Sequence, residues 1–352
     1  MQEFKYFTKT LFALLVLFIM ITSCRKKIDF DKESKFETSP FGPYQQYYEP
    51  WQSVNASLTG TPTLINTDNS FLYIASESSG RSYMRYMNSN LVSYPLFYSN
   101  NYKFTAIEKG NTKMIIGASG GQYSLREFDE NGIYATFNFY VTPDRKINDI
   151  STDGLKIYPV GNFVGTNLNP SSFSVDKHNK VTNTSEGMPG IAGEVLDIEK
   201  HLGEFYIAGN EILNFQHSIA KWNGSQWQPF ANIDDDKVTG ISWIGDTLFI
   251  AGYANGQTAI RKYANGSLIE DNIVVNTASS EEETDIKLYE YGTSLYAYGT
   301  INFPGSPYTS VLEYQNGQWN YVGNLGGVAK DIVAFGGYLY AIVGNSVKRI
   351  QL

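Results

Sequence analysis

The chain has 352 residues, of which 35 are acidic and 27 are basic, so its formal net charge at pH 7 is -8. An acidic surface repels nucleic acid and anionic lipid headgroups, and the charge therefore argues against both as partners. There is a single cysteine, and the three histidines lack the spacing of a metal site, so neither a metal nor a cofactor is predicted.

The N-terminus has the pattern of a secretory signal. Lys5 and Lys9 precede an apolar stretch over residues 11–21, which is followed by small residues. The stretch is shorter than the roughly 20 apolar residues that a membrane-spanning helix needs. The sequence therefore predicts a secreted chain rather than one held by a transmembrane helix.

The segment Ile21-Thr22-Ser23-Cys24 resembles the lipobox of bacterial lipoproteins. The resemblance implies that residues 1–23 are a cleaved signal peptide and that Cys24 is acylated, which would anchor the protein stably in a lipid bilayer. No disulfide-linked partner is then expected. The alternative is an ordinary secreted protein with an isolated cysteine.

Residues 24–46 are predicted to be the lipidated cysteine and a flexible tether, because they lack a periodic apolar pattern. Arg25-Lys26-Lys27 lacks the acidic signal that is often associated with export to the cell surface. We therefore expect an outer membrane lipoprotein that faces the periplasm rather than the cell surface.

The rest of the chain, residues 47–352, repeats one apolar and aromatic phrase that reads roughly Leu-Tyr-Ile-Ala-Gly. The second residues of successive copies are 42, 43, 48, 43, 47 and 44 positions apart. A period of about 40 to 50 residues built from short strands is typical of a β-propeller with one blade per repeat. The copies occupy residues 72–76, 114–118, 157–161, 205–209, 248–252, 295–299 and 339–343.

Each repeat also predicts the other strands of a blade. Eight residues before the second position of the phrase the chain always has an apolar residue, which indicates a buried first strand. Asn-Gly pairs such as Asn265-Gly266 and Asn316-Gly317 favour a tight turn between a third and a fourth strand. The apolar column comprises Ile65, Ile107, Ile150, Ile198, Ile241, Leu288 and Ile332. The predicted fold is all-β, a seven-bladed propeller of four-stranded antiparallel blades.

The chain ends after the third strand of the seventh repeat, so that blade lacks a fourth strand. Fourth strands elsewhere begin with Trp227 and Trp319, and a matching segment, 50–54, contains Trp51. We expect this N-terminal strand to pair with the C-terminal blade and close the ring, which would remove an exposed sheet edge.

The repeated phrase, with the Trp-Asn-Gly-x-x-Trp segment over 222–227, is loosely similar to kelch and galactose-oxidase-like propellers of bacterial lipoproteins. The paired glycines of kelch repeats and the Gly-His and Trp-Asp pairs of WD40 repeats are missing. The copper chemistry of galactose oxidase needs a Tyr crosslinked to Cys, which the anchor role of Cys24 excludes.

An acidic column stands just before the buried apolar one, at Asp149, Asp197 and Asp331, with Lys287 at the same place in the sixth repeat. In one interpretation these carboxylates surround the mouth of a central channel and act as catalytic or ligand-binding groups. In the other, each Asp accepts hydrogen bonds from the backbone of its own or the next blade.

Long connections on one face of a rigid ring are where function is expected. Aromatic and polar residues on these loops are candidates for a ligand platform, because rings stack on sugars while polar groups bond hydroxyls. Packing of the loops is the alternative. His178 and His201 are interpreted as exposed turn residues. The candidate ligand-binding residues are Arg81, Tyr83, Tyr102, Phe163, Phe215, His217, Tyr253, Phe303 and Tyr308.

The sequence therefore predicts a membrane-anchored, extracytoplasmic binding or scaffold module. Its ligand would be a glycan, a peptide or a protein held by the long-loop face. The alternative is a polysaccharide hydrolase or lyase with acidic residues at the channel mouth, which rests on fold analogy alone.

Overall fold

The computed structural model describes residues 50–352 except 122, 143–144, 165–172, 187, 213–216, 231–236, 255–256, 277–285 and 302–310. Residues 44–352 form one compact unit. The predicted signal peptide, Cys24 and the whole of the predicted tether lie outside the described residues. In the part of the chain that is described, no helix has the length and apolar character of a membrane span.

The described chain is built from small antiparallel sheets, as predicted, and hydrogen bonds join its strands into six sheets. The first two sheets are β2 (Thr61–Thr67), β3 (Leu72–Ser78), β4 (Arg81–Met87), β5 (Ser93–Ser99), and β6 (Lys103–Lys109), β7 (Met114–Ser119), β8 (Leu125–Asp129), β9 (Gly132–Phe137). The third is β10 (Lys146–Thr152), β11 (Lys156–Val164), β12 (Phe173–Val175), β13 (His178–Asn179), β14 (Thr184–Ser185).

The fourth sheet has eight strands and contains two repeats, because Asn210 pairs with Lys237 and so joins β16 to β19. Its strands are β15 (Glu194–His201), β16 (Glu204–Glu211), β17 (His217–Trp222), β18 (Trp227–Pro229), β19 (Lys237–Ile244), β20 (Thr247–Ala254), β21 (Gln257–Ala264) and β22 (Ser267–Asn276). The last two sheets are β23 (Ile286–Tyr291), β24 (Ser294–Gly299), β25 (Val311–Gln315), β26 (Gln318–Tyr321), and β27 (Ala329–Phe335), β28 (Tyr338–Val343), β29 (Ser346–Gln351), β1 (Gln52–Val54).

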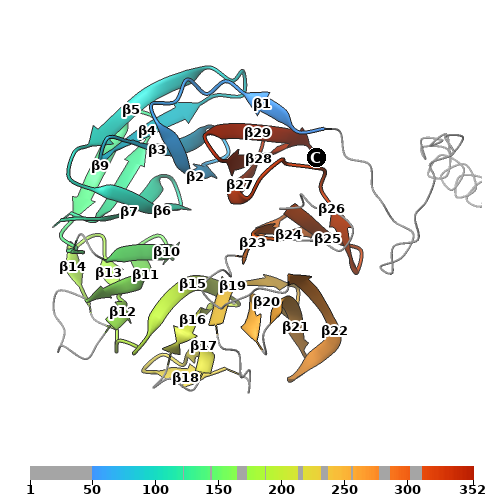
Figure 1. Cartoon of the computed structure of the whole chain (residues 1–352). Coiled ribbons are helices and arrows are strands. Elements are labelled where there is room, and N and C mark those ends of the chain that lie inside the picture. Colours follow the sequence, from blue (N-terminus) through green and yellow to red (C-terminus); the bar gives the residue numbers. More distant parts are fainter. Residues whose placement is uncertain are drawn as a thin grey trace, which may run out of the picture. The chain divides into compact units, whose positions relative to one another are not determined.

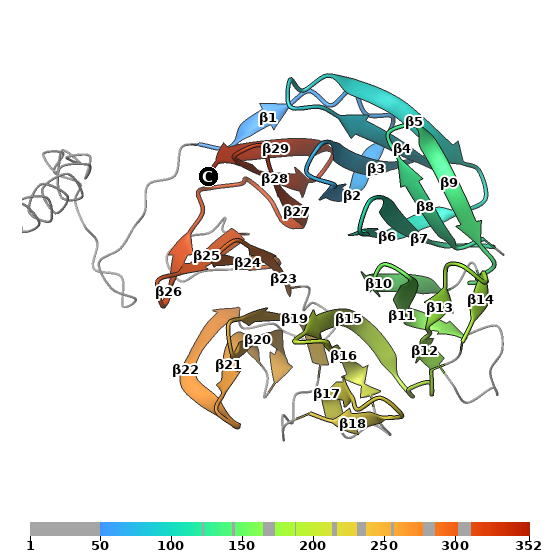
Figure 2. The ribbon, with the colours of Figure 1, turned by 180° about the vertical axis from the view of Figure 1, so that it is seen from behind.

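The sheets stand around a common centre, with the first strand of each repeat innermost and the last outermost (Figures 1 and 2). Each innermost strand contacts the next, in the order β2, β6, β10, β15, β19, β23 and β27, and β27 also contacts β2. Apolar side chains fill the space between neighbouring sheets; one such cluster joins Tyr296 and Val311 to Ile332 and Leu339. These contacts form the core of the propeller.

The predicted buried column is confirmed at six of its seven positions, where the isoleucines are at most 8% exposed. Leu288 is the exception, since it is half-buried. It is also in the one innermost strand, β23, that pairs with its neighbour without a register shift. Each of the other six innermost strands has a register shift at the same place, two residues before the isoleucine. In β10, for example, the shift lies between Ile147 and Asp149, and Ile150 follows.

The predicted turn chemistry accounts for the tight connections. Asn265 and Gly266, between β21 and β22, have φ angles of 53° and 81°, and Asn316 and Gly317 have 53° and 84°. Both residues of each turn thus have the positive φ that a two-residue hairpin turn requires. Turns between first and second strands, and between third and fourth strands, emerge at one end of the sheets, termed the short-turn face. The remaining connections emerge at the other end, the long-loop face.

The N-terminal strand β1 lies beside the last strand of the chain. β1 pairs antiparallel with β29, from Gln52 opposite Arg349 to Val54 opposite Val347. Just before β1, the indole nitrogen of Trp51 donates a hydrogen bond to the carbonyl oxygen of Val322, at 2.7 Å. The sheet of β27, β28 and β29 therefore contains four strands drawn from both ends of the described chain.

Candidate functional site

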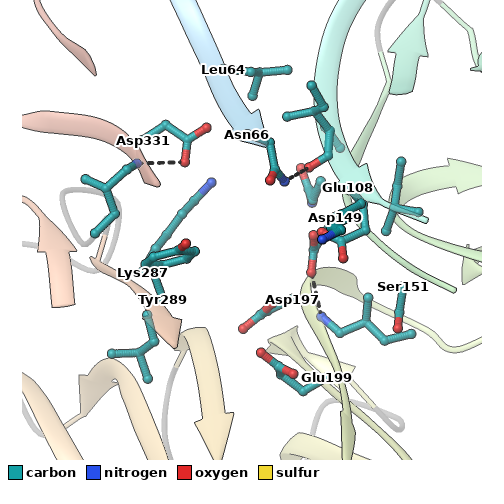
Figure 3. A pocket seen from close by; sticks show the side chains of 18 of the residues that line it. Leu64, Asn66, Glu108, Asp149, Ser151, Asp197, Glu199, Lys287, Tyr289 and Asp331 are labelled. Carbon is teal, nitrogen blue, oxygen red and sulfur yellow. Dashed lines mark hydrogen bonds between the residues drawn. The ribbon is translucent and has the colours of Figure 1, made fainter. Parts of the chain in front are cut away.

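A cavity of about 530 Å³ lies at the centre of the ring, and residues of all seven innermost strands line it (Figure 3). Its lining is rich in charged side chains, because residues two apart on each of these strands point to the same side of the sheet. The charged residues of the lining are Glu108, Lys109, Asp149, Asp197, Glu199, Lys200, Lys287, Glu290 and Asp331.

Each aspartate of the predicted acidic column bonds the sheet that follows it. An oxygen of Asp149 accepts a hydrogen bond from the backbone nitrogen of Ile198, at 3.1 Å. Asp197 accepts from Ile241 at 2.6 Å, and Asp331 accepts from the first repeat, at Ile65, at 2.8 Å. The three carboxylates line the cavity, but each commits one oxygen to backbone in the way that the structural interpretation predicted.

The carboxylates on the inner strands of the second, third and fourth repeats crowd one side of the cavity (Figure 3). Burial raises the pKa of Glu108 to about 8, and the charge of Asp149 adds to the effect. Burial and then the charge of Glu199 raise the pKa of Asp197 to about 6. The pKa values of Asp149 and Glu199 are raised well above their usual range, first by burial and then by neighbouring carboxylates. Burial and crowding thus favour the protonated form of the carboxyl groups on this side of the cavity.

Lys287 occupies the acidic column in the sixth repeat and extends into the cavity from the other side (Figure 3). Burial raises the pKa of Asp197 and that of Asp331 to about 6 each. The positive charge of Lys287 lowers both pKa values and so opposes the effect of burial. The cavity is thus of mixed charge. Among the described residues, no three His, Cys, Asp or Glu side chains are grouped so that they could hold a metal ion.

Sequence reasoning missed Glu108 and Glu199, although the sequence contains a signal for both. Each directly follows a buried isoleucine, and Glu199 stands two residues after Asp197. In a strand, that spacing places Glu199 on the face of the aspartate. Polar residues two positions after the acidic column could therefore have been predicted to line the cavity.

Several of the predicted ligand-binding residues lie within strands. Arg81 and Tyr83 lie in β4, where the Tyr83 ring is 6.2 Å from that of Tyr98. Tyr253 lies in β20 and is half-buried. Phe163 was wrongly included, because it is only 1% exposed and packs edge-on against Phe139 at 5.2 Å. Phe215, Phe303 and Tyr308 lie outside the described residues, and of His217 the structure describes only its place at the start of β17.

Two histidines were also wrongly interpreted as exposed turn residues. His178 is completely buried, with its ring 5.5 Å from the ring of Phe137. His201 is partly covered, because its ring stacks on Trp243 at 4.1 Å and an interplanar angle of 6°. Both rings are covered by residues of a neighbouring repeat, which a local turn pattern cannot reveal.

Tyr102 lies in a group of residues that we name the Tyr-Arg cluster, formed by Tyr102, Tyr123, Arg126 and Tyr140. The Arg126 guanidinium stands 4.2 Å from the centre of the Tyr102 ring, and its Nε donates to the carbonyl oxygen of Tyr123. Tyr123 and Tyr140 are 42% and 44% exposed. The cluster lies on the long-loop face, at the connections before β6, before β8 and before β10.

Gly121 allows this cluster to form. A Cβ atom at residue 121 would lie 2.5 Å from the Tyr102 ring, so a larger residue would displace the tyrosine. Gly121 also exchanges backbone hydrogen bonds with Val141, which fixes the connection that contains Tyr140. The Tyr102 ring therefore packs directly against the Gly121 backbone, and the same glycine holds the connection that follows β9.

No family model and no curated protein matches the chain. Solved propellers match it in fold. The structure of YCF48 bound to D1 peptide has a TM-score of 0.59 and 11% identity, covering 88% of this chain and 97% of that one. The WD40 propeller domain of Doa1 has a TM-score of 0.57 and 11% identity, with coverages of 85% and 96%. The computationally designed protein Ika8 has a TM-score of 0.54 and 10% identity, covering 85% of this chain and 98% of that one. By its fold, the chain is a β-propeller.

Proposed function

We propose that the protein is a binding or scaffold module whose long-loop face holds a glycan, peptide or protein ligand. The Tyr-Arg cluster carries the proposal. It includes two tyrosines, Tyr123 and Tyr140, that are 42% and 44% exposed, and both stand on connections held by a rigid scaffold. Exposed tyrosines suit a ligand with both apolar faces and polar groups, because each offers an aromatic face and a hydroxyl. The YCF48 propeller was solved with a peptide, which supports a peptide as one of these ligand classes.

The scaffold of this module is a ring of seven blades that its own N-terminal strand closes. The eight-stranded sheet corresponds to two blades, since among the described residues a single strand pair, Asn210 with Lys237, joins β16 to β19. The pairing of β1 with β29, the Trp51 hydrogen bond and the bond from Ile65 to Asp331 support closure between the last and the first repeat.

The module is anchored in a membrane through acylated Cys24 and works outside the cytoplasm, on the periplasmic side of an outer membrane. The support is the signal-like N-terminus and the lipobox resemblance. Growth of expressing cells with a labelled fatty acid tests this anchor. We expect the label on the protein and its complete loss in the Cys24→Ser variant; a label that persists in that variant would refute acylation at this residue.

The ligand proposal is tested with the unit of residues 44–352 on glycan and peptide arrays. We expect at least one class to bind, and we expect Tyr123→Ala with Tyr140→Ala to weaken that binding about tenfold or more, since stacked aromatic contacts of this kind each contribute about 0.5–1.5 kcal/mol beyond area burial. Tyr134→Ala, an exposed tyrosine on the short-turn face, is the matched control. Equal loss in the control would refute the assignment to the long-loop face.

The alternative, a polysaccharide hydrolase or lyase that uses Asp149, Asp197 and Asp331, has less support. All three carboxylates bond backbone nitrogens of a neighbouring repeat. Measuring product release on the same glycan array separates the two functions. Glycan that is bound without cleavage supports a binding module, and turnover that is lost in the Asp149→Asn variant would favour the enzyme.

A further inference from the structure

The most exposed apolar side chains of the described chain gather on the short-turn face. Leu202, Val181, Tyr134 and Leu155 are 83%, 80%, 70% and 66% exposed, more than any other large apolar residue that is described. We name these four residues the tip patch. Three stand in turns, between β15 and β16, between β13 and β14 and between β10 and β11, while Tyr134 follows the turn into β9.

The members of the tip patch belong to one continuous surface of three neighbouring repeats. The carbonyl oxygen of Leu155 accepts a hydrogen bond from Lys180, beside Val181, at 3.0 Å. The hairpins that end at Leu155 and Leu202 lie side by side, because the rings of Tyr158 and Phe205 are 4.2 Å apart.

Tyr134 is joined to the same surface. The ammonium of Lys113 stands 4.2 Å above its ring, and the turn that precedes Lys113 contacts the neighbouring hairpin, where the Asn111 side chain lies against Gly154. The four apolar side chains are therefore neighbours across adjacent sheets, each projecting from a separate tip.

Leu202 is placed against local preference. Its φ angle is 50°, a left-handed conformation in which asparagine and glycine are favoured and branched apolar residues are strained. A leucine here is both strained and almost fully exposed. Residues that break two local rules without a compensating contact are expected at functional positions rather than at positions chosen for stability.

The charges around the tip patch are balanced, in contrast to the acidic molecule as a whole. Lys156 and Lys177 pair with Glu186 at 2.7 and 3.0 Å, Lys180 pairs with Glu127, and Lys113 pairs with Asp129. Each of these lysines thus has a carboxylate partner, so this face offers little free positive charge to an anionic membrane. Long lysine side chains can also extend their charge away while their stems cover apolar surface.

We propose that the tip patch docks the propeller on a lipid bilayer of zwitterionic headgroups, so that the long-loop face points away from the membrane. Separate protruding apolar tips need no shape complementarity when they insert among lipid chains, whereas a protein partner would have to match each of them. The proposal rests on the proposed anchor, and the chain between Cys24 and Pro50 is long enough for it, since 26 residues extend to at most about 90 Å.

The test uses residues 44–352, which lack Cys24, in sedimentation with vesicles of phosphatidylcholine and phosphatidylethanolamine. We expect the protein to sediment with the vesicles, with little change when salt is raised. The variant Leu155→Ser, Val181→Ser, Leu202→Asn should lower the partition coefficient about a thousandfold, because each of the three buried aliphatic side chains contributes about tenfold. The control Tyr98→Ser, Val328→Ser, on the long-loop face, should bind as the parent does.

The single variant Leu202→Asn separates docking from folding. Asparagine accepts the positive φ of residue 202, so the melting temperature should stay the same or rise while vesicle binding falls. A parent protein that does not sediment, binding that requires phosphatidylglycerol and disappears with salt, or a dimer that the tip variant abolishes would each overturn the proposal. Failure of acylation at Cys24 would leave this result unchanged, so docking and anchor are judged separately.

Discussion

Asp331 bonds the seventh repeat to the first with a single carboxylate, and its removal is the simplest test of these inter-sheet bonds. One of its oxygens accepts from the Ile65 nitrogen at 2.8 Å and the other from the Tyr298 hydroxyl at 3.2 Å. Asp331→Ala removes the side-chain acceptor of the buried Ile65 nitrogen and one hydrogen bond of the Tyr298 hydroxyl, so the free energy of unfolding in urea should fall by about 1–3 kcal/mol.

Asp331→Asn is the matched variant, because its amide oxygen can still accept one of the two bonds. Its stability should lie between that of Asp331→Ala and that of the parent. Equal stability of all three proteins in urea would contradict the assigned role of this carboxylate.

At the scale of single residues, the sequence predicted where a residue lies within its strand better than whether residues of another repeat bury it. The acidic column could be found because its members recur at one place in the repeat. The burial of His178 could not, since the rings that cover it, Phe137 and Phe139, come from the preceding repeat. A residue whose neighbours are distant in sequence has no local pattern that reveals them.

At the scale of elements, β1 provides the next prediction. Trp51→Ala removes both the hydrogen bond to Val322 and the packing of the indole against the cluster that contains Ile350. The free energy of unfolding should fall by about 2 kcal/mol. Deleting residues 47–58 should lower the melting temperature further, since β29 would become an unpaired edge.

Trp51→Phe is the control, because it retains most of the apolar contact and loses only the donor. It should destabilise less than Trp51→Ala. A deletion variant whose melting transition is unchanged would show that β1 does not hold the ring together.

The strand pattern was largely predictable because turns and alternation are local. Gly245 and Gly336, for example, stand in tight turns between first and second strands and have φ angles of 57° and 58°. The joining of β16 to β19 was not predictable, because the pair Asn210 and Lys237 depends on how two repeats meet. The regular register of β23, where Lys287 stands at the position of the aspartates in the acidic column, was not predicted either. It is a property of how β23 pairs with β24.

At the scale of the whole molecule, the carboxylates around the cavity predict how stability changes with pH. Burial raises the pKa of Glu108 from 4.5 to about 8 and that of Asp197 from 3.8 to about 6. The folded protein therefore binds more protons than the unfolded chain between these values. Stability from these groups is fully present below the unfolded pKa and is lost as the pH rises through the folded pKa.

We therefore expect the free energy of unfolding, measured in urea, to fall as the pH is raised from 5 to 8. Each carboxyl group contributes about one proton to the difference in protons bound by the folded and the unfolded protein. Glu108→Gln should flatten the decline, because it removes the group with the pKa of about 8. Lys109 and Lys287 also line the cavity, and their charges lower the pKa values of Glu108 and of Asp197 and Asp331, so removing either lysine should steepen the decline. Glu130→Gln, outside the cavity, is the control; a stability that rises steadily over this range would contradict the prediction.

The propeller as a whole was predictable from a repeated phrase, whereas the place of its ligand was only partly so. Tyr102 was predicted, but its partner Arg126 was not, because Tyr102 stands just before β6 and Arg126 lies two strands further on in the same sheet. The tip patch was not predicted either. Exposed leucine and valine in turns carry no periodic signal, and only the three-dimensional arrangement shows that Leu155, Val181 and Leu202 share one surface.

The inter-sheet aspartate bonds also have a consequence for how such a ring can change by gene duplication. In the fourth repeat, Asp197 accepts a hydrogen bond from Ile241 of the fifth repeat, and the backbone nitrogen of Ile198 donates one to Asp149 of the third. Two adjacent residues of this repeat thus supply its acceptor for one neighbour and its donor for the other. A copied repeat of this type would bring its own connections to both neighbours, so a ring could gain a member without two matching substitutions elsewhere.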